Sequence, residues 1–388
     1  MSMPPLDNAT ARYAPKPRID PRWTRLVWPL AALVVLLLFD LIFIPGFFSI
    51  SLKDGKLYGT VINILDRAAP VLLLSIGMTL VIATGGVDLS VGAVMAIAGS
   101  VAAELARGPG GPVAAIAAAL LVALLAGAWN GFLVAVLGIQ PIVATLILMV
   151  AGRGIAQLVT GGQIVPLRGN TFQFLGQGFL FLVPFSLTVF AVTLLLTAVA
   201  VRKTALGLFI EAVGGNATAS RYAGVNATAV KWLVYVFSGL CAGVAGLLGA
   251  ADILAADANN AGLYLELDAI LAVVVGGTAL TGGRFSLPGS VLGALVIQTL
   301  TMTILTMGIA PEWTLVVKAL VVIVVCLLQA EGLQEKVRGM FRRTSAPPQG
   351  FAPILSQPTE PPQHAAGETP PALPTVEGTG NQLPASRT

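Results

Sequence analysis

One stretch of the sequence places polar and flexible residues inside an otherwise apolar region. Residues 83–92 contain glycines at 85, 86 and 92 together with Asp88 and Ser90. Glycine weakens helices, and irregular backbone at membrane depth is tolerated only where protein or water satisfies its polar groups. If the region crosses a membrane, the pattern predicts a broken helix whose Asp88 contacts a transported solute, because intramembrane acids are usually functional. An equally compatible alternative is that Asp88 only caps a helix that begins at Leu89.

Other polar side chains lie singly within apolar segments. Arg153 and Gln157 are four residues apart, which places them on one face of a helix, where they can line a wet path. The acidic and amide-rich connection 255–268 contains Asn259, Asn260, Glu266 and Asp268. Its carboxamides and carboxylates suit contact with a sugar or with an extracytoplasmic partner, although a solvated loop explains them equally well. We therefore predict a substrate path lined by Asp88, Ser90, Asn130, Arg153, Gln157, Asn259 and Asn260.

The sequence argues against several kinds of catalytic chemistry. Its two cysteines, Cys241 and Cys326, are 85 positions apart in apolar stretches, and its single histidine is His364. Neither a disulfide framework nor a zinc site fits this spacing. The sequence contains no G-x-x-x-x-G-K-[ST] pattern, so it has no P-loop for ATP. We predict no catalytic residue, no metal site and no cofactor bound by this chain.

Membrane helices must position these residues. Of the 388 residues, 56% are apolar and 10% are charged, against about 25% charged in a soluble domain, and the mean hydropathy is +0.87. Charge-free stretches such as 108–152 and 169–201 exceed the roughly 20 residues that cross a bilayer. The predicted fold class is an all-α polytopic membrane protein with about ten transmembrane helices and a broken helix near residues 84–92. The predicted spans are 26–45, 61–83, 89–106, 113–137, 142–159, 178–200, 229–251, 267–280, 289–308 and 313–330.

Basic residues indicate how the chain is oriented. With the N-terminus inside, fourteen Lys and Arg residues lie on the cytoplasmic side and seven on the other face or in the outer halves of spans. This excess predicts that both termini are cytoplasmic. We predict a cytoplasmic N-terminal segment at 1–25, a transmembrane domain at 26–335 and a Pro-rich, disordered cytoplasmic tail at 336–388.

Two further patterns lie on the predicted inner side. Residues 204–225 predict an amphipathic surface helix, because Ala205, Leu208, Phe209, Ala212 and Val213 form an apolar stripe. Such a helix lies at the membrane interface or docks a cytoplasmic protein. In addition, Thr84-Gly85-Gly86 with Gly92 and Val94 is echoed 197 positions later by Thr281-Gly282-Gly283 with Gly289 and Val291. This echo reflects either an internal repeat, which is common in transporters, or chance.

Several of these segments together identify a family. The chain resembles the ribose-type permeases of ABC sugar importers in three segments. These are the glycine break with Asp88, the inner loop Glu211-Ala212-Val213-Gly214-Gly215-Asn216 with Arg221 and Gly224, and the run 265–270 leading to Gly282-Gly283-Arg284. The likeness covers about residues 20–335 and is greatest to the galactofuranose permease subgroup. One departure is Ala219-Ser220, where the family often has two alanines.

The resemblance implies a permease subunit that translocates a monosaccharide, galactofuranose, across the bacterial inner membrane. It implies three partners besides the lipid bilayer: a cytoplasmic ABC ATPase that binds ATP and Mg²⁺, a periplasmic sugar-binding protein, and a second permease subunit, expected to be a different chain. It also assigns contact with the ATPase to Glu211, Gly214, Asn216, Arg221 and Gly224.

Two other classes of function compete with this reading. An ion-coupled secondary sugar transporter needs an intramembrane ionisable site, and Asp88 is a candidate for it. A membrane enzyme ranks third, because the sequence provides no nucleophile with a base and no metal-binding set. Nothing in the sequence indicates a nucleic-acid partner.

Overall fold

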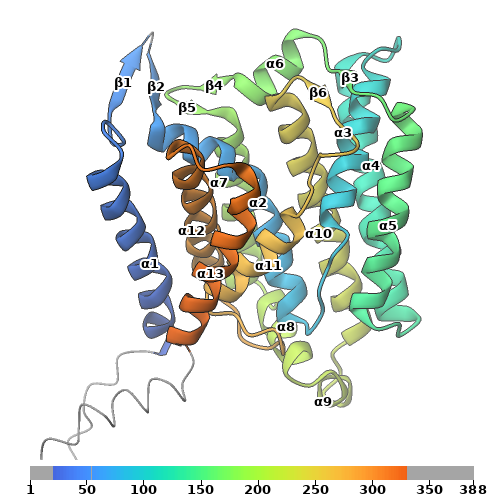
Figure 1. Cartoon of the computed structure of the whole chain (residues 1–388). Helices are drawn as coiled ribbons and strands as arrows, with labels where there is room; N and C mark the ends of the chain where they lie inside the picture. Colours follow the sequence, from blue (N-terminus) through green and yellow to red (C-terminus); the bar gives the residue numbers. More distant parts are fainter. Residues whose placement is uncertain (1–20, 54, 330–388) are drawn as a thin grey trace, which may run out of the picture. The chain divides into compact units, whose positions relative to one another are not determined.

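The computed structural model describes residues 21–53 and 55–329, which fold almost entirely into helices (Figure 1). The longer helices are α1 (Pro21–Phe43), α2 (Thr60–Ala83), α3 (Val91–Leu105), α4 (Gly111–Gly131), α5 (Pro141–Thr160), α7 (Phe185–Lys203), α10 (Ala227–Asp252), α11 (Leu265–Val275), α12 (Leu287–Thr306) and α13 (Pro311–Gln329). The shorter ones are α6 (Asn170–Gln177), α8 (Leu206–Gly215), α9 (Ala217–Tyr222) and η1 (Phe132–Val136), a π-helical turn that extends α4.

The strands form three short antiparallel pairs. β1 (Ile50–Lys53) pairs with β2 (Lys56–Gly59), with Ile50 opposite Gly59. The other pairs are β3 (Val165–Pro166) with β6 (Ala255–Ala256), and β4 (Phe179–Leu180) with β5 (Val183–Pro184). Figure 1 shows β1, β2 and α6 at one end of the helices, the β1–β2 end, and α8 and α9 at the other, the α8–α9 end, where α1 begins and α13 ends.

The predicted fold class is confirmed. Among the described residues, seven helices are long and apolar enough to cross a bilayer: α1, α2, α4 with η1, α5, α7, α10 and α12. The remaining predicted spans coincide with α3, α11 and α13. With 15 and 11 residues, α3 and α11 are too short to cross alone. The predicted break is present, because α2 ends at Ala83 and α3 begins at Val91.

The predicted boundaries are wrong at two helices. α7 begins at Phe185 instead of 178, because residues 179–184 form the β4–β5 turn, in which Phe181 adopts a φ of 55°. α11 ends at Val275 instead of 280. α1 itself begins at Pro21, but its membrane-length apolar stretch runs from Leu26 to Phe43, which confirms the predicted start of this span at 26. Proline suits the first turn of a helix, where its missing N–H is not needed. The predicted tail 336–388 lies outside the described residues.

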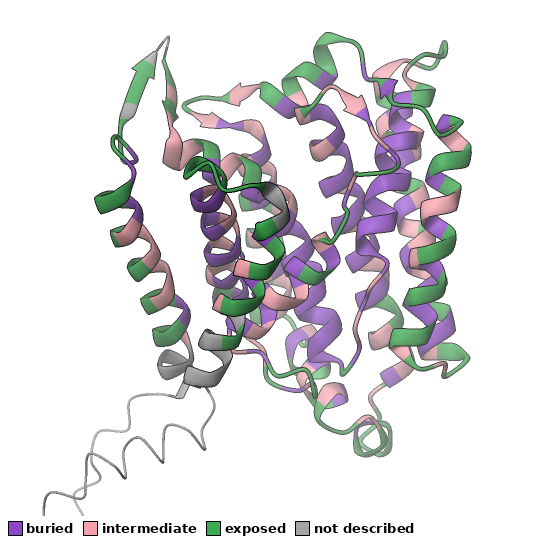
Figure 2. Ribbon diagram, in the orientation of Figure 1, coloured by how far each residue is buried: buried purple, intermediate pink, exposed green. Residues whose placement is uncertain are grey.

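Two helices, α2 and α10, form the centre of the packing. Every residue of α2 from Val71 to Ala83 is buried, so this part of the helix is covered by protein on all sides. Figure 2 shows the same burial along much of α10, while α1 and α5 expose much of their surface. Small residues permit close contact: a Cβ on Gly127 of α4 would lie 2.5 Å from the Tyr235 carbonyl oxygen of α10. Gly127 and Gly131 are spaced as in the GxxxG pattern, which allows two membrane helices to approach closely.

Candidate functional site

Two half-length helices begin opposite each other inside the bundle. α3 runs from its start towards the β1–β2 end, and α11 runs from its start towards the α8–α9 end (Figure 1). Their starts are in contact, because a Cβ on Gly92 would overlap the carbonyl oxygen of Gly262. The connecting segments 84–90 and 257–264 cross the rest of the bundle without helical structure, apart from short turns. Broken helices of this kind form the solute sites of many transporters.

Asp88 lies at the centre of a closed hydrogen-bonded cluster in the first of these segments. Its Oδ1 accepts bonds from the Ser90 N–H (3.1 Å), the Ser90 hydroxyl (2.7 Å) and the Asn130 amide (3.4 Å). Its Oδ2 accepts the Ser238 hydroxyl of α10 (2.9 Å). Asp88 and Ser90 are each 1% exposed and Asn130 is fully buried. This cluster joins the broken segment to α4 and α10.

The alternative of Asp88 as a helix cap is wrong in position. α3 begins at Val91, two residues later than that hypothesis requires, and Ser90 occupies the cap position. The Ser90 side chain makes no bond to the helix backbone and instead donates to Asp88. Asp88 therefore holds the residue at the cap position, while its own contacts reach α4 and α10.

Arg153 and Glu266 lie next to the meeting point of α3 and α11. The Arg153 guanidinium donates to the carbonyl oxygen of Ala261, and a Cβ on Gly92 would lie 3.3 Å from its Nη2. Glu266, in the first turn of α11, is 4% exposed, and its Oε2 has no hydrogen-bond partner among the described residues. The partial positive charge at the start of α11 stabilises this acid. Sequence reasoning placed Glu266 in the acidic connection that suits contact with a sugar, but the predicted path did not include it.

The remaining predicted path residues meet nearer the β1–β2 end. The Gln157 side-chain amide donates to Asn259 Oδ1 at 2.9 Å, and both residues are exposed. Asp257 orders the loop by accepting the Asn260 side-chain amide (2.7 Å) and the backbone amides of Asn259 and Asn260. The bond from the Asn260 side chain, together with these amides, lowers the pKa of the Asp257 carboxyl from its ordinary value.

The structure thus divides the seven predicted path residues. Asp88, Ser90 and Asn130 form the buried cluster, and Gln157 pairs with Asn259 at the surface. Arg153 contacts the same connecting segment at Ala261, and Asn260 lines a cavity of about 230 Å³ beside Met95 and Gly262. No group of three or more His, Cys, Asp or Glu side chains suited to a metal ion occurs within the described ranges.

The predicted coupling segment forms α8 and α9 at the end opposite Asn259. Asn216 separates the two helices and caps α9 by accepting the Ala219 N–H at 2.9 Å. Gly224 has a φ of 86°, a conformation that glycine adopts readily. Glu211 is half-buried, whereas Asn216 and Arg221 are exposed.

The apolar stripe predicted for this segment lies on its exposed side, except for Val213, which is buried. The buried residues of α8 are Gly207, Ile210 and Val213. Leu208 is 68% exposed and Phe209 is 37% exposed. α8 packs against neighbouring helices through its small and branched residues. Tertiary contacts determine which face of α8 is buried, and hydrophobic periodicity alone does not. Its larger apolar side chains are left on the surface together with Tyr222, which is 90% exposed.

Gly214 of α8 is packed against both glycine-rich breaks. The Gly283 N–H donates to the Ala83 carbonyl at 2.8 Å, joining the end of α2 to the connection after α11. A Cβ on Gly214 would overlap that carbonyl oxygen and lie 2.6 Å from the Gly283 nitrogen. A Cβ on Gly282 would lie 2.8 Å from the Gly85 nitrogen. The two echoed Thr-Gly-Gly segments therefore meet each other and α8, a junction that sequence reasoning missed.

Comparisons with known proteins agree with a transport role. The family model described as "Branched-chain amino acid transport system / permease component" matches residues 60–326. The chain is 53% identical over 322 residues to the galactofuranose transporter permease protein YtfT of Escherichia coli strain K12, covering 83% of this chain and 94% of that protein. It is 39% identical to the fructose import permease protein FruF of Bifidobacterium longum, covering 85% and 94%, and 35% identical to the ribose import permease protein RbsC of Escherichia coli strain K12, covering 77% and 92%. No solved structure matches this chain.

Proposed function

The chain belongs to the permease-component family described as branched-chain amino acid transport system / permease component, and on this premise we propose that it translocates a monosaccharide, galactofuranose, as the membrane subunit of an ABC importer. The likeness to the galactofuranose permease along nearly its whole length carries the proposal. The buried polar cluster at a broken helix supports it, because a transporter needs polar groups within the membrane. The chain is a multi-pass membrane subunit and not an enzyme.

A separate cytoplasmic ABC ATPase supplies the energy and holds the ATP and Mg²⁺. We place its contact at the α8–α9 end, on Glu211, Gly214, Asn216, Arg221 and Gly224. The exposed Leu208, Phe209 and Tyr222 support this placement, because large apolar side chains grouped on a surface favour protein docking. Since α1 begins and α13 ends at this end (Figure 1), a cytoplasmic α8–α9 end puts both termini of the described chain on the cytoplasmic side of the bacterial inner membrane.

Of the two remaining partners, one binds at the opposite end and the other lies beside this chain in the membrane. A periplasmic sugar-binding protein delivers sugar at the β1–β2 end, and a second permease subunit of different sequence completes the membrane unit. Within this chain the sugar passes Asn259, Asn260, Gln157 and Arg153, and then reaches the cluster of Asp88, Ser90 and Asn130. Amide and charged groups at intervals satisfy sugar hydroxyls that an apolar path leaves unbonded.

The decisive test of function is energy coupling in proteoliposomes. We expect the permease, its second subunit and the ATPase to take up galactofuranose only when ATP and the binding protein are both present. An ionophore that dissipates proton and sodium gradients should leave uptake unchanged. Uptake without ATP that the ionophore abolishes would instead establish an ion-coupled transporter, and absence of sugar uptake with all partners present would reject the function.

The proposed path predicts different reactivity of single cysteines towards a water-soluble thiol reagent. In a chain carrying Cys241→Ala and Cys326→Ala, we expect Gln157→Cys and Asn259→Cys to react at rest, because both positions are exposed. Asn130→Cys should be unreactive at rest, because the position is fully buried, and should react while the ATPase hydrolyses ATP. Failure of the cysteine at position 130 to react during turnover would remove Asn130 from the path.

A further inference from the structure

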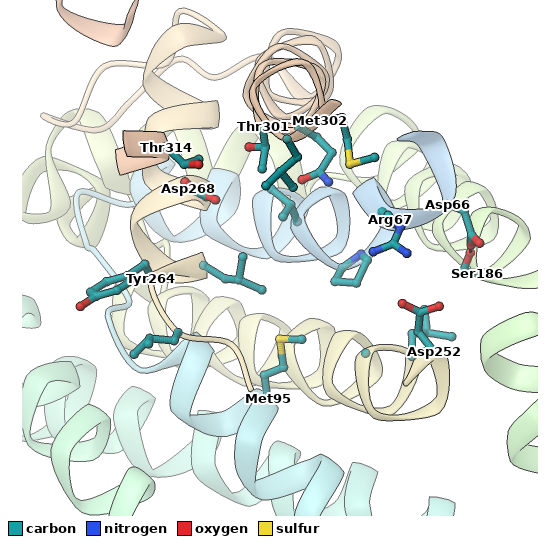
Figure 3. A pocket seen from close by; sticks show the side chains of 18 of the residues that line it. Asp66, Arg67, Met95, Ser186, Asp252, Tyr264, Asp268, Thr301, Met302 and Thr314 are labelled. Carbon is teal, nitrogen blue, oxygen red and sulfur yellow. Dashed lines mark hydrogen bonds between the residues drawn. The ribbon is translucent and has the colours of Figure 1, made fainter. Parts of the chain in front are cut away.

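A cavity of about 560 Å³ lies between α2, α10, α11, α12 and α13 (Figure 3). Most of its lining residues belong to the first halves of α2, α11 and α13 and to the last halves of α10 and α12. Successive helices alternate in direction, so all of these parts lie towards the β1–β2 end. None of the seven predicted path residues lines the cavity. It is therefore a second candidate site, on the side where the binding protein is proposed to release its sugar.

Hydrogen-bonding groups stand on two sides of the cavity, with apolar side chains between them. Figure 3 shows Asp66, Arg67 and Asp252 on one side and Asp268 with Thr314 on the other. The Ser186 hydroxyl donates to Asp66. Gln298 and Thr301 of α12 supply further donors and acceptors, and Pro70, Met95 and Leu248 are among the apolar lining residues. Such a lining offers both polar partners and a carbon surface.

Two observations at the Asp268 side of the cavity point to a ligand-binding site. Lys318 of α13 and Asp268 of α11 form an ion pair at 2.8 Å, and both residues are less than 10% exposed. Thr314, one turn before Lys318, is 9% exposed, and its Oγ1 has no hydrogen-bond partner among the described residues. A buried hydroxyl without a partner costs free energy unless a ligand or water bonds to it. The cavity thus holds an unused hydrogen-bonding group beside a fixed pair of charges.

We propose that this cavity binds a neutral monosaccharide before it enters the membrane path, with the Thr314 hydroxyl, Gln298 and the Asp268–Lys318 pair bonding its hydroxyl groups. Each sugar hydroxyl both donates and accepts, so a lining that contains carboxylates, an ammonium, an amide and hydroxyls can satisfy several at once. The volume lies within the range of small-molecule sites. This inference rests on the proposed function in sugar import.

The charges of the lining favour a neutral sugar over an anionic ligand. Its charged residues are Asp66, Asp252 and Asp268 against Arg67 and Lys318, so the carboxylates outnumber the cations. Lys318 is already paired with Asp268. A sugar phosphate would meet an excess of like charge and no free buried cation among the described lining residues. A neutral polyol meets no such repulsion.

The test is protection of an engineered cysteine in the complete transporter. In a chain carrying Cys241→Ala and Cys326→Ala, Thr301→Cys places a thiol in the cavity and Ser51→Cys places one on exposed β1 at the same end. The probe is D-galactose, whose solutions contain the furanose form, and L-leucine is the comparison solute. At a D-galactose concentration about ten times its dissociation constant, we expect modification at position 301 to slow about tenfold. Modification at position 51 should not change, and L-leucine should not protect.

Removing polar groups from the cavity should weaken this protection. With Thr314→Val and Gln298→Leu added, we expect half-protection to need a sugar concentration at least about fivefold higher, because each lost hydrogen bond weakens binding about two- to tenfold. The matched control is Thr197→Val, at a threonine lining a separate, largely apolar cavity of about 370 Å³. It should leave protection unchanged.

The possible failures are distinguishable. A transporter that takes up D-galactose normally but shows no protection at position 301 overturns the cavity proposal and leaves the proposed function intact. Protection by L-leucine in place of D-galactose overturns the assignment to sugars. Equal protection in the control and in the Thr314→Val, Gln298→Leu chain overturns the named contacts. A complete transporter that takes up no sugar overturns the proposed function and this inference with it.

Discussion

Gly214→Ala is expected to reduce sugar uptake by about tenfold or more, while the chain still inserts into the membrane. The added methyl group would overlap the Ala83 carbonyl oxygen and lie 2.6 Å from the Gly283 nitrogen. Those two atoms form the hydrogen bond that joins the two glycine-rich breaks. Backbone cannot yield as a flexible side chain does, and overpacking costs about 1–3 kcal/mol. α8 must therefore move away from the ends of the broken helices, and the contact through which the ATPase is proposed to act is displaced.

The adjacent residue provides the matched control. Gly215→Ala adds the same methyl group one position later, where nothing lies within 4 Å of it and the backbone φ is not positive. Uptake and ATP hydrolysis measured in proteoliposomes should be close to wild type for Gly215→Ala and strongly reduced for Gly214→Ala. Wild-type uptake by Gly214→Ala would show that the close packing of α8 against the two breaks is unimportant for transport.

Asp88→Leu is expected to cause the largest loss of stability among single substitutions of the predicted path. It removes the acceptor of four hydrogen bonds, from the Ser90 N–H and hydroxyl, the Ser238 hydroxyl and the Asn130 amide. Each buried donor left without a partner costs about 1–3 kcal/mol. Several such losses approach the whole stability of a typical domain, about 5–15 kcal/mol. Asp88→Asn, which keeps the shape of the side chain, should lose less.

An exposed acid provides the comparison for Asp88. The Glu104 side chain is 45% exposed and pairs with Arg107 three residues later at 3.1 Å, a type of contact worth at most about 1 kcal/mol. Thermal unfolding of the detergent-solubilised chains should give a much lower Tm for Asp88→Leu than for Glu104→Leu. Similar Tm values for the two variants would contradict the view that the Asp88 cluster holds the broken segment to α4 and α10.

Sequence reasoning located the broken helix because its signal is local. Glycines at 85 and 86, followed by an acid, interrupt a run that is otherwise apolar, and backbone flexibility there does not depend on distant contacts. Periodicity also predicted an apolar stripe on the segment that contains α8, but it did not determine which face of that helix packs against the rest of the protein. Four apolar positions of that segment are exposed, since the neighbouring helices admit Gly207, Ile210 and Val213 in their place. Which face of a short helix is buried depends on the shape of the neighbouring helices against which it packs.

The sequence by itself determined that this chain is a polytopic helical membrane protein of the ABC permease type, where its helices lie, and that Asp88 stands at a break. Hydropathy, helix-breaking residues and the family motifs are properties of consecutive residues, so they can be read without a fold. Only the tertiary structure decided that Asp88 bonds to Ser238 across 150 residues, that Gly214 lies against both breaks, and that Asp268 and Lys318 pair beside an unpartnered Thr314. These contacts join residues far apart in the chain, and which ones form is set by how the helices pack together.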